Sequence, residues 1–443
     1  MEEKNIIAIE IGSSKVRGAI GTYSADGVLT ASAVEEEPMK DWVRNGTVSN
    51  VEEVASLVSR VIRKIENRVS PRKVASVYVG LGGRSFMSLK RDVETGFSEE
   101  IEITDNEISQ LIDKAKHTPY ADRELYGIEP CKFMVDKSEV SQPKGTLGNS
   151  IKMSANLIIS RPQPKRNIER LFNEKLKLSI AGFQVRQLAI ADVVLTNDEK
   201  RLGCILVDFG AETTAVSIYK HGKLQYFTTL PLGGRNVTRD IMQLHMIEER
   251  AEELKCSVGN ASSTVATAAI GGTEYMELNN YVSHRAGEII ANVREQLKYA
   301  GYKANDLTGG IIVVGGGTRL AGFNERLSSR LGMKLRTGSV NVSEVRITNS
   351  KISATEMVDV LSVLCAAVKN NPVDCLMEPA VEEPQVIITQ QEVEAEKKEE
   401  PVQEEEVQKP KRRSSFLDKF KSLAEKLMTD SDNDDDDVYR DDD

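Results

Sequence analysis

Near its start the chain reads Ile6-Ile7-Ala8-Ile9-Glu10-Ile11-Gly12-Ser13-Ser14-Lys15-Val16-Arg17-Gly18. Much later it reads Ile205-Leu206-Val207-Asp208-Phe209-Gly210-Ala211-Glu212-Thr213-Thr214-Ala215-Val216. In both stretches an apolar run ends in an acid, one residue and a glycine, and then turns through small hydroxyl residues into a second apolar run. Each continues into a further hairpin, at Gly27 and at Gly222. Duplication at this distance predicts two related domains, each with a sheet that starts as a β-hairpin.

Helical patterns follow each set of strands, so the sequence predicts an α/β fold. Residues 50–67 have apolar side chains at helical spacing, and Asn50 is a suitable N-cap. Residues 105–116 form a second helical pattern, which Thr104 is placed to cap. The apolar face of the first helix comprises Val54, Leu57, Val58, Val61, Ile62 and Ile65.

The turn chemistry favours phosphate binding. A tight glycine turn with successive backbone N–H groups and hydroxyls makes a small anion site. The acid at the strand end can hold Mg²⁺ through water. A third segment, residues 309–323, is a strand that runs into three glycines, which let the backbone approach a flat ligand closely. One such hairpin alone is equally consistent with an ordinary core hairpin, whereas the pair favours a polyphosphate clamp.

Together these segments resemble the actin/Hsp70/hexokinase ATPase superfamily. The two hairpins look like its phosphate loops, and the triple glycine looks like its adenosine loop. Residues 233–241 and 251–255 are similar to two further nucleotide motifs of the bacterial actins. Within the superfamily the chain is most similar to the FtsA family of cell-division proteins, through residues 195–203, 158–160 and 181–183.

The resemblance implies an actin-like, ribonuclease H-like duplicated fold with two lobes, an inserted 1C (SHS2-like) subdomain, a disordered linker and a C-terminal amphipathic helix. The expected boundaries are 1–82 for subdomain 1A, 83–163 for 1C, 164–202 for the return to 1A, 203–232 for 2A, 233–305 for 2B, 306–353 for 2A, 354–375 for a helix returning to the first lobe, 376–410 for the linker, 411–428 for the amphipathic helix and 429–443 for an acidic disordered tail.

The resemblance also implies ATP and Mg²⁺ as ligands. Glu10 and Asp208 are expected to hold the metal through water. The expected cofactor residues are Gly12, Ser13, Ser14, Lys15, Asp208, Gly210, Thr213, Thr214, Gly233, Gly234, Arg235, Glu252, Lys255, Gly315, Gly316 and Gly317.

Several positions depart from the superfamily pattern. Glu10 stands where an Asp is usual, and Ala211 and Glu212 replace glycines in the second loop. A carboxylate at Glu212 repels a triphosphate unless it points away or binds the metal. Residues 187–194 also lack the usual acid-Pro pattern near the water-activating position. Because phosphoryl transfer depends on positioning, we expect ATP binding with weak or absent hydrolysis, and no catalytic residue is assigned.

Composition sets limits on the class of protein. The net charge of −10 comes largely from the C-terminal stretch, and basic residues are scattered, which argues against nucleic-acid binding. The five cysteines are widely spaced without a CxxC pair, as in a reducing compartment. The four histidines show no metal-ligand spacing. The N-terminus runs straight into a strand pattern, so we expect no signal peptide.

The C-terminal segment has the pattern of a helix in a membrane interface. Basic residues flank one apolar face, and anionic lipid attracts them. A helix that packs on a partner protein is the alternative for this segment taken alone. A long tether behind an FtsA-like domain favours the membrane. The apolar face comprises Phe416, Leu417, Phe420, Leu423, Leu427 and Met428.

The resemblance implies a filament-forming protein that ties FtsZ to the cytoplasmic face of the bacterial inner membrane at the division septum. Anionic lipids, a second copy of the chain and other division proteins, reached through 1C, are the further expected partners. Arg285 and Glu288 resemble an Arg-x-x-Glu pair that contacts FtsZ, although an ordinary surface ion pair fits them equally. An actin-like pilus-assembly protein and a sugar or acid kinase are the alternatives. An Hsp70-type chaperone is disfavoured because the tail cannot form a peptide-binding domain.

Overall fold

Two related sheets form the centre of the protein in this computed structural model, which describes residues 3–117, 122–262, 273–369 and 371–378. The predicted amphipathic helix at 411–428 lies outside these residues, as does the acidic tail. Among the described residues, none of the helices is both long enough and apolar enough to span a bilayer.

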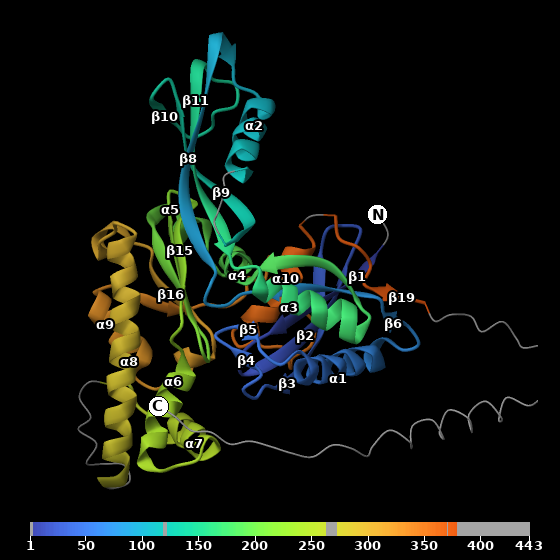
Figure 1. The fold of residues 1–443 in the computed structure, drawn as a ribbon, viewed down its shortest axis with the longest axis vertical. Helices are drawn as coiled ribbons and strands as arrows, with labels where there is room; N and C mark the ends of the chain where they lie inside the picture. The colour runs from blue at the N-terminus through green and yellow to red at the C-terminus, as the bar shows by residue number, and fades with distance from the viewer. Residues whose placement is uncertain (1–2, 118–121, 263–272, 370, 379–443) are drawn as a thin grey trace, which may run out of the picture. The chain divides into compact units, whose positions relative to one another are not determined.

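The first sheet belongs to the N-terminal lobe (Figure 1). Its strand order is β12-β7-β1-β2-β3-β18, with β1–β2 and β2–β3 antiparallel and β1–β7 and β7–β12 parallel. The strands are β1 (Lys4–Ile11), β2 (Lys15–Tyr23), β3 (Leu29–Pro38), β7 (Ser76–Leu81), β12 (Ser179–Val185) and β18 (Arg346–Ile347).

The second sheet repeats this order. Five neighbouring strands of this sheet run β15-β14-β13-β16-β17, again as an antiparallel meander followed by two parallel neighbours. The strands are β13 (Cys204–Phe209), β14 (Thr214–Lys220), β15 (Lys223–Leu230), β16 (Gly310–Val314) and β17 (Leu335–Thr337). The predicted duplication and the α/β class are therefore confirmed.

Helices cover both sheets. In the first lobe α1 (Val51–Val69) buries the predicted apolar face against β2 and β3. Its predicted cap is present, since the Asn50 side chain accepts the Glu53 N–H at 3.2 Å. The other first-lobe helices are α3 (Gln163–Glu169), α4 (Arg186–Val194) and α10 (Val358–Ala367), with a π-helix at Arg170–Leu176; α5 (Asn197–Leu202) packs on β14, and the second lobe also has α6 (Gly234–Ile241), α7 (Glu248–Val258), α8 (Thr273–Tyr299) and α9 (Phe323–Leu331).

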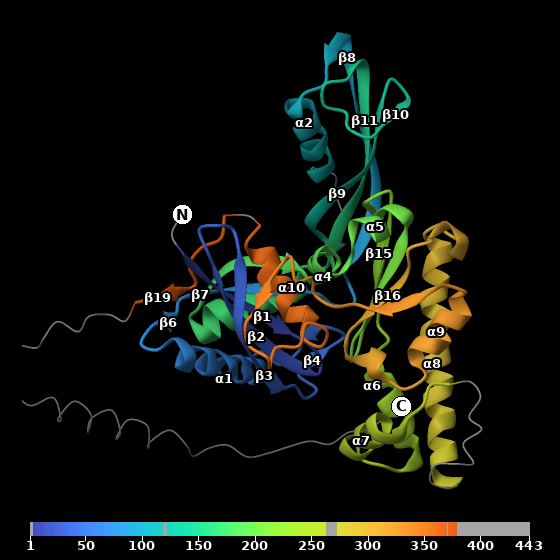
Figure 2. The same ribbon diagram turned by 180° about the vertical axis from the view of Figure 1, so that it is seen from behind.

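A separate module is inserted between β7 and α3. Its strands are β8 (Met87–Glu102), β9 (Glu124–Val135), β10 (Ser138–Val140) and β11 (Leu147–Ser160), and α2 (Asp105–Lys116) packs against them (Figure 2). The predicted Thr104 cap forms a capping box with Glu107. The module joins the second sheet, because β8 pairs with β15 at Met87 and Thr228.

The end of the described chain differs from the prediction. A helix was expected over 354–375 and a disordered linker from 376. The helix spans only Val358–Ala367, and Leu376–Met377 forms a strand, β19, antiparallel to β6 (Lys73–Val74). Leu376 is buried and its N–H is bonded to Asp374, so the fold holds these residues against the first lobe.

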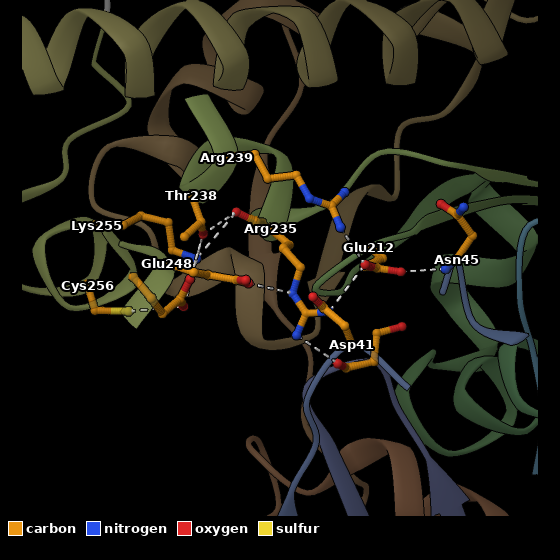
Figure 3. Close-up of polar contacts among 12 residues, drawn as sticks. Asp41, Asn45, Glu212, Arg235, Thr238, Arg239, Glu248, Lys255 and Cys256 are labelled. Atoms are coloured by element: carbon orange, nitrogen blue, oxygen red, sulfur yellow. Dashed lines mark hydrogen bonds and ion pairs between the residues drawn. The ribbon is translucent and has the colours of Figure 1, made fainter. Parts of the chain in front are cut away.

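Glu212 links the two lobes. Its carboxylate accepts hydrogen bonds from Nη1 of Arg235 at 3.2 Å and from Nη2 of Arg239 at 3.0 Å, both on α6. It also accepts one from the backbone N–H of Asn45 in the first lobe. Figure 3 shows Glu212 with the two guanidinium groups on one side and Asn45 on the other. The side chain of Glu212 is 4% exposed and does not line the cleft, so its carboxylate points away from it. The expected repulsion between Glu212 and a triphosphate is therefore avoided.

Arg235 extends this link. Besides Glu212, its guanidinium reaches the Asp41 carboxylate at 3.1 Å and the carbonyl oxygen of Ser13 at 3.1 Å, both in the first lobe. It also contacts Glu248 at 3.5 Å. We name the set of Asp41, Asn45, Glu212 and Arg235 the interlobe clasp, because its bonds run from one lobe to the other.

The clasp gives a stability prediction. Glu212→Ala leaves the 11%-exposed Arg235 without its main buried partner, and breaking a buried pair in this way costs about 3 kcal/mol in the free energy of unfolding. Arg239→Ala is the matched control, because Arg239 is 51% exposed and its loss should cost less than about 1 kcal/mol. Urea unfolding of both variants measures the difference, and equal losses would refute the role of Glu212.

Candidate functional site

A cleft of about 1240 Å³ lies where the two sheets meet. The turns after β1 and β13 and the loop after β16 all line it, so Gly12, Gly210 and Gly316 converge on one cavity. Segments far apart in the sequence thus form one surface. This convergence is the geometry that the repeated sequence predicts.

The two hairpin turns have matching backbone geometry. The N–H of Gly12 donates to the carbonyl oxygen of Lys15 at 2.9 Å, and the N–H of Gly210 donates to that of Thr213 at 2.9 Å. In each strand the acid lies two residues before the glycine, at Glu10 and Asp208. The repeat therefore places a carboxylate from each lobe at the same depth of the cleft.

The triple-glycine loop packs against the second hairpin. Gly315 has φ +92°, and a Cβ there would lie 2.5 Å from the carbonyl oxygen of Phe209. A Cβ at Gly317 would lie 2.6 Å from the Phe209 ring. That ring stacks on Phe323 of α9 at 4.4 Å between centroids. A side chain at either glycine would separate the loop from β13, so this close approach requires glycine.

All the predicted cofactor residues line the cleft except Thr214 and Gly233. Thr214 is buried in β14 and donates its hydroxyl to the Leu232 carbonyl at 2.7 Å. A Cβ at Gly233 would lie 2.4 Å from the carbonyl oxygen of Ala211. Both residues fix the second hairpin against α6, where the Gly234 N–H donates to the Gly210 carbonyl at 3.0 Å.

Glu252 and Lys255 lie one turn apart on α7 and pair with each other. The Lys255 ammonium is 2.6 Å from the Glu252 carboxylate and 3.0 Å from the Thr238 hydroxyl. Figure 3 shows Lys255 and Thr238 close together beside the clasp. The pair lines the cleft on the side of the second lobe.

Arg186, which the sequence analysis did not select, lies between the two strand-end acids. Its Nη1 is 2.8 Å from Oε1 of Glu10, and its Nη2 is 2.9 Å from Oδ2 of Asp208. The side chains of the two acids are 4% and 8% exposed, and that of Arg186 is 18% exposed. One guanidinium therefore bridges both lobes at the base of the cleft.

Burial and charge shape the titration of these groups. Burial raises the pKa of Glu10, and Asp359 adds to the rise, whereas Arg186 opposes it. Burial likewise raises the pKa of Asp208, against the effect of Arg186. Burial works to lower the pKa of Arg186, but Asp208 and Glu10 together raise it above its ordinary value, so the guanidinium stays charged.

The predicted magnesium position does not fit this arrangement. Glu10 and Asp208 were expected to hold Mg²⁺ through water, yet the guanidinium of Arg186 already occupies the space between their carboxylates. Nor do the described residues include a cluster of three or more His, Cys, Asp or Glu side chains that could hold a metal ion.

Arg285 and Glu288 lie outside the cleft, on α8. The predicted ion pair between them is present, and Arg285 also binds both carboxylate oxygens of Asp240 on α6, at 2.6 and 2.9 Å. Asp240 thus holds the Arg285 guanidinium in place, while Glu288 remains 51% exposed.

Asp359 and Arg17 are among the other charged residues of the cleft that the sequence did not mark. Asp359, in the first turn of α10, binds Nη1 of Arg17 at 2.7 Å, and both line the cleft. The sequence offered no signal for Arg186, because Mg²⁺ was the expected counter-charge of Glu10 and Asp208. Nothing in the local pattern of residues 183–188 marks that arginine as their partner.

Family comparisons agree with this architecture. Residues 205–358 match the family model described as "Cell division protein FtsA", and residues 83–159 match "SHS2 domain inserted in FTSA". The second match coincides with the inserted module of β8–β11.

Similar proteins point the same way. "Cell division protein FtsA" of Porphyromonas gingivalis is 32% identical over 338 residues, covering 73% of this chain and 70% of the relative. The protein of that name in Escherichia coli is 26% identical over 348 residues, covering 73% and 81%.

A solved structure supports the fold alone. The "PilM-PilN type IV pilus biogenesis complex" aligns with TM-score 0.58 at 15% identity, covering 82% of this chain and 98% of that one. With the duplicated sheets, the inserted module and the relatives above, the fold is actin-like. The chain belongs to the FtsA family of bacterial cell-division proteins.

Proposed function

We propose that this chain is an ATP-binding, actin-like division protein that forms filaments and ties an FtsZ ring to the cytoplasmic face of the inner membrane at the septum, as a peripheral protein. The convergence of Gly12, Gly210 and Gly316 on one cleft is the observation that carries the nucleotide part. The pilus-assembly alternative has only a likeness of fold behind it, whereas family membership favours division. No group of the cleft specifically favours a sugar or acid kinase.

The cleft has the parts that a nucleotide needs. The turns at Ser13–Lys15 and at Ala211–Thr213 would hold phosphates through backbone N–H groups and hydroxyls. The ribose and base would lie between Glu252 and Lys255 on one side and the triple glycine on the other. ATP would then touch both lobes at once and favour one arrangement of the two.

Hydrolysis should be slow. Each strand-end carboxylate is ion-paired with Arg186 through one oxygen, which opposes its action as a base toward water. Gln187, the next residue, donates to the Ser217 hydroxyl at 3.0 Å and does not line the main cleft. ATP is therefore better placed as a structural ligand than as a substrate with rapid turnover.

Gly316→Val tests the nucleotide site. A Cβ at Gly316 has no heavy atom within 4 Å, so the added side chain would extend into the open space of the cleft without straining the fold. We expect ATP affinity to fall by about tenfold or more, or about 1.4 kcal/mol, at an unchanged melting temperature. Gly96→Val, in the inserted module, is the control. Unaltered ATP binding by the Gly316 variant in titration calorimetry would remove the assignment.

The membrane part rests on residues 411–428 and their sequence pattern. Insertion of a large apolar side chain contributes about 1.5–3 kcal/mol, and each basic residue near anionic lipid adds roughly 1 kcal/mol. A single short helix binds weakly, so filaments that present many helices would raise the avidity.

Co-sedimentation with anionic liposomes tests this anchor. The full chain should bind, and a variant ending at Pro410 should remain in the supernatant. Within the full chain, Phe420→Glu should also abolish binding, because it places a charge on the predicted apolar face. Ser422→Glu adds the same charge to the opposite face and should bind nearly as wild type. Equal binding by all four proteins would end the anchor proposal.

The FtsZ contact is proposed for the α8 surface around Arg285 and Glu288. Asp240 holds the arginine, so a partner would meet a preset guanidinium beside an exposed carboxylate. Contacts of the inserted module with other copies or other division proteins are proposed on the basis of family membership.

Glu288→Ala should weaken binding to FtsZ of the same organism by about tenfold, or about 1.4 kcal/mol, as expected when an interface hot spot is truncated. Glu295→Ala is the matched control, because Glu295 forms a similar pair with Lys298 at 2.7 Å further along the same helix. Fluorescence anisotropy with labelled FtsZ measures both. Equal affinities of the two variants would place the contact elsewhere.

A further inference from the structure

The charges around the strand-end acids are organised around one arginine. Arg186 is the first residue of α4, and its guanidinium joins Glu10 from the first lobe to Asp208 from the second. It lines the cleft, and its Cζ would lie 3.6 Å from a Cβ at Gly82. The group is therefore fixed at the base of the cleft by two nearly buried partners.

The neighbouring charges cancel one another, so the negative charge at the base of the cleft comes from Glu10 and Asp208. Arg17 pairs with Asp359 at 2.7 Å and with Glu36 at 3.1 Å, and Lys15 pairs with Glu36 at 2.6 Å. Two cations therefore stand against two acids in this outer group. Arg186 is the counter-charge that directly contacts Glu10 and Asp208, so without it both carboxylates would face incoming phosphates and repel them.

We propose that Arg186 is the resident cation of the cleft: it offsets part of the negative charge of Glu10 and Asp208 and turns its remaining N–H groups to the nucleotide phosphates, so ATP binding does not require a divalent metal. This inference rests on the proposed nucleotide function and deepens it. It departs from the Mg²⁺ expected at the same carboxylates.

The chemistry of the guanidinium supports this role. It has five N–H donors in one plane and carries its charge at every accessible pH. One donor goes to each carboxylate at 2.8 and 2.9 Å. The remaining donors suit phosphate oxygens, for which the planar fork is well matched. A hydrated Mg²⁺ would have to displace this group to reach Oε1 of Glu10 and Oδ2 of Asp208.

Titration of the full chain with a fluorescent ATP analogue, in 5 mM Mg²⁺ or in EDTA, tests the proposal; that concentration is roughly a saturating one for a weak site. The wild-type dissociation constants in the two conditions should differ by less than about threefold. Arg186→Gln should bind about tenfold more weakly in EDTA, and Mg²⁺ should restore most of the loss, because the freed carboxylates can then hold the hydrated ion.

Two variants keep the result interpretable. Arg186→Lys retains the charge but cannot bridge both acids through one planar fork, so its affinity in EDTA should lie between those of wild type and Arg186→Gln. It also serves if the glutamine variant fails to fold. Arg336→Gln removes a guanidinium that binds Glu199 outside the cleft and should respond to metal as wild type does.

The outcomes separate the inference from the proposed function. Wild-type binding that is lost in EDTA and present with Mg²⁺ would overturn the role of Arg186 and leave nucleotide binding intact. Absence of binding in both conditions would overturn both. An Arg186→Gln affinity equal to wild type in EDTA would also refute the inference, since the guanidinium would then contribute nothing.

Discussion

Two carboxylates, each at the end of an equivalent strand, are brought together at the base of a cleft, and the fold must supply a positive charge to keep them there. Ionised acids buried within a few ångströms of each other repel strongly unless a cation or a proton intervenes. Arg186 supplies that cation from α4, which directly follows strand β12 of the first sheet. The duplication thus brings two like charges together, at Glu10 and Asp208. Arg186, which offsets them, comes from the first lobe only.

In the interlobe clasp another buried carboxylate, that of Glu212 in the turn after β13, is also paired with arginines. A carboxylate placed in a phosphate loop would oppose an anionic ligand, but α6 presents two arginines and the first lobe presents a backbone N–H. The acid therefore contributes to cohesion between the lobes instead of to the charge of the cleft. Asp208 and Glu212 both belong to the second hairpin, and both are bonded to the first lobe, through Arg186 and Asn45 respectively. The relative position of the lobes and the charge of the cleft are therefore linked.

Much of the fold could be predicted from the sequence because its signals are local or repeated. The alternation and glycine turns around Gly12 and Gly210 predicted both meanders, and periodicity with a cap at Asn50 predicted α1. The position of Arg186 was beyond that reasoning, because its partners lie 176 and 22 residues away and only the folded sheets bring them together. The direction of the Glu212 side chain was likewise undetermined, since it depends on α6. The short strand at Leu376–Met377 was missed because a two-residue pairing carries no period.

The inserted module has one consequence for mechanics. Its chain leaves and re-enters the first lobe, yet its firm contacts are with the second: Ser88 bonds to the backbone of Phe227 at 2.8 Å, and Asn156 bonds to the Leu224 carbonyl at 2.8 Å. The module therefore packs on β15 of the second lobe, while its two connecting segments join it to the first lobe. A hinge motion between the lobes would move these connecting segments relative to β15. A small change in the cleft would then produce a larger displacement at the far end of the module.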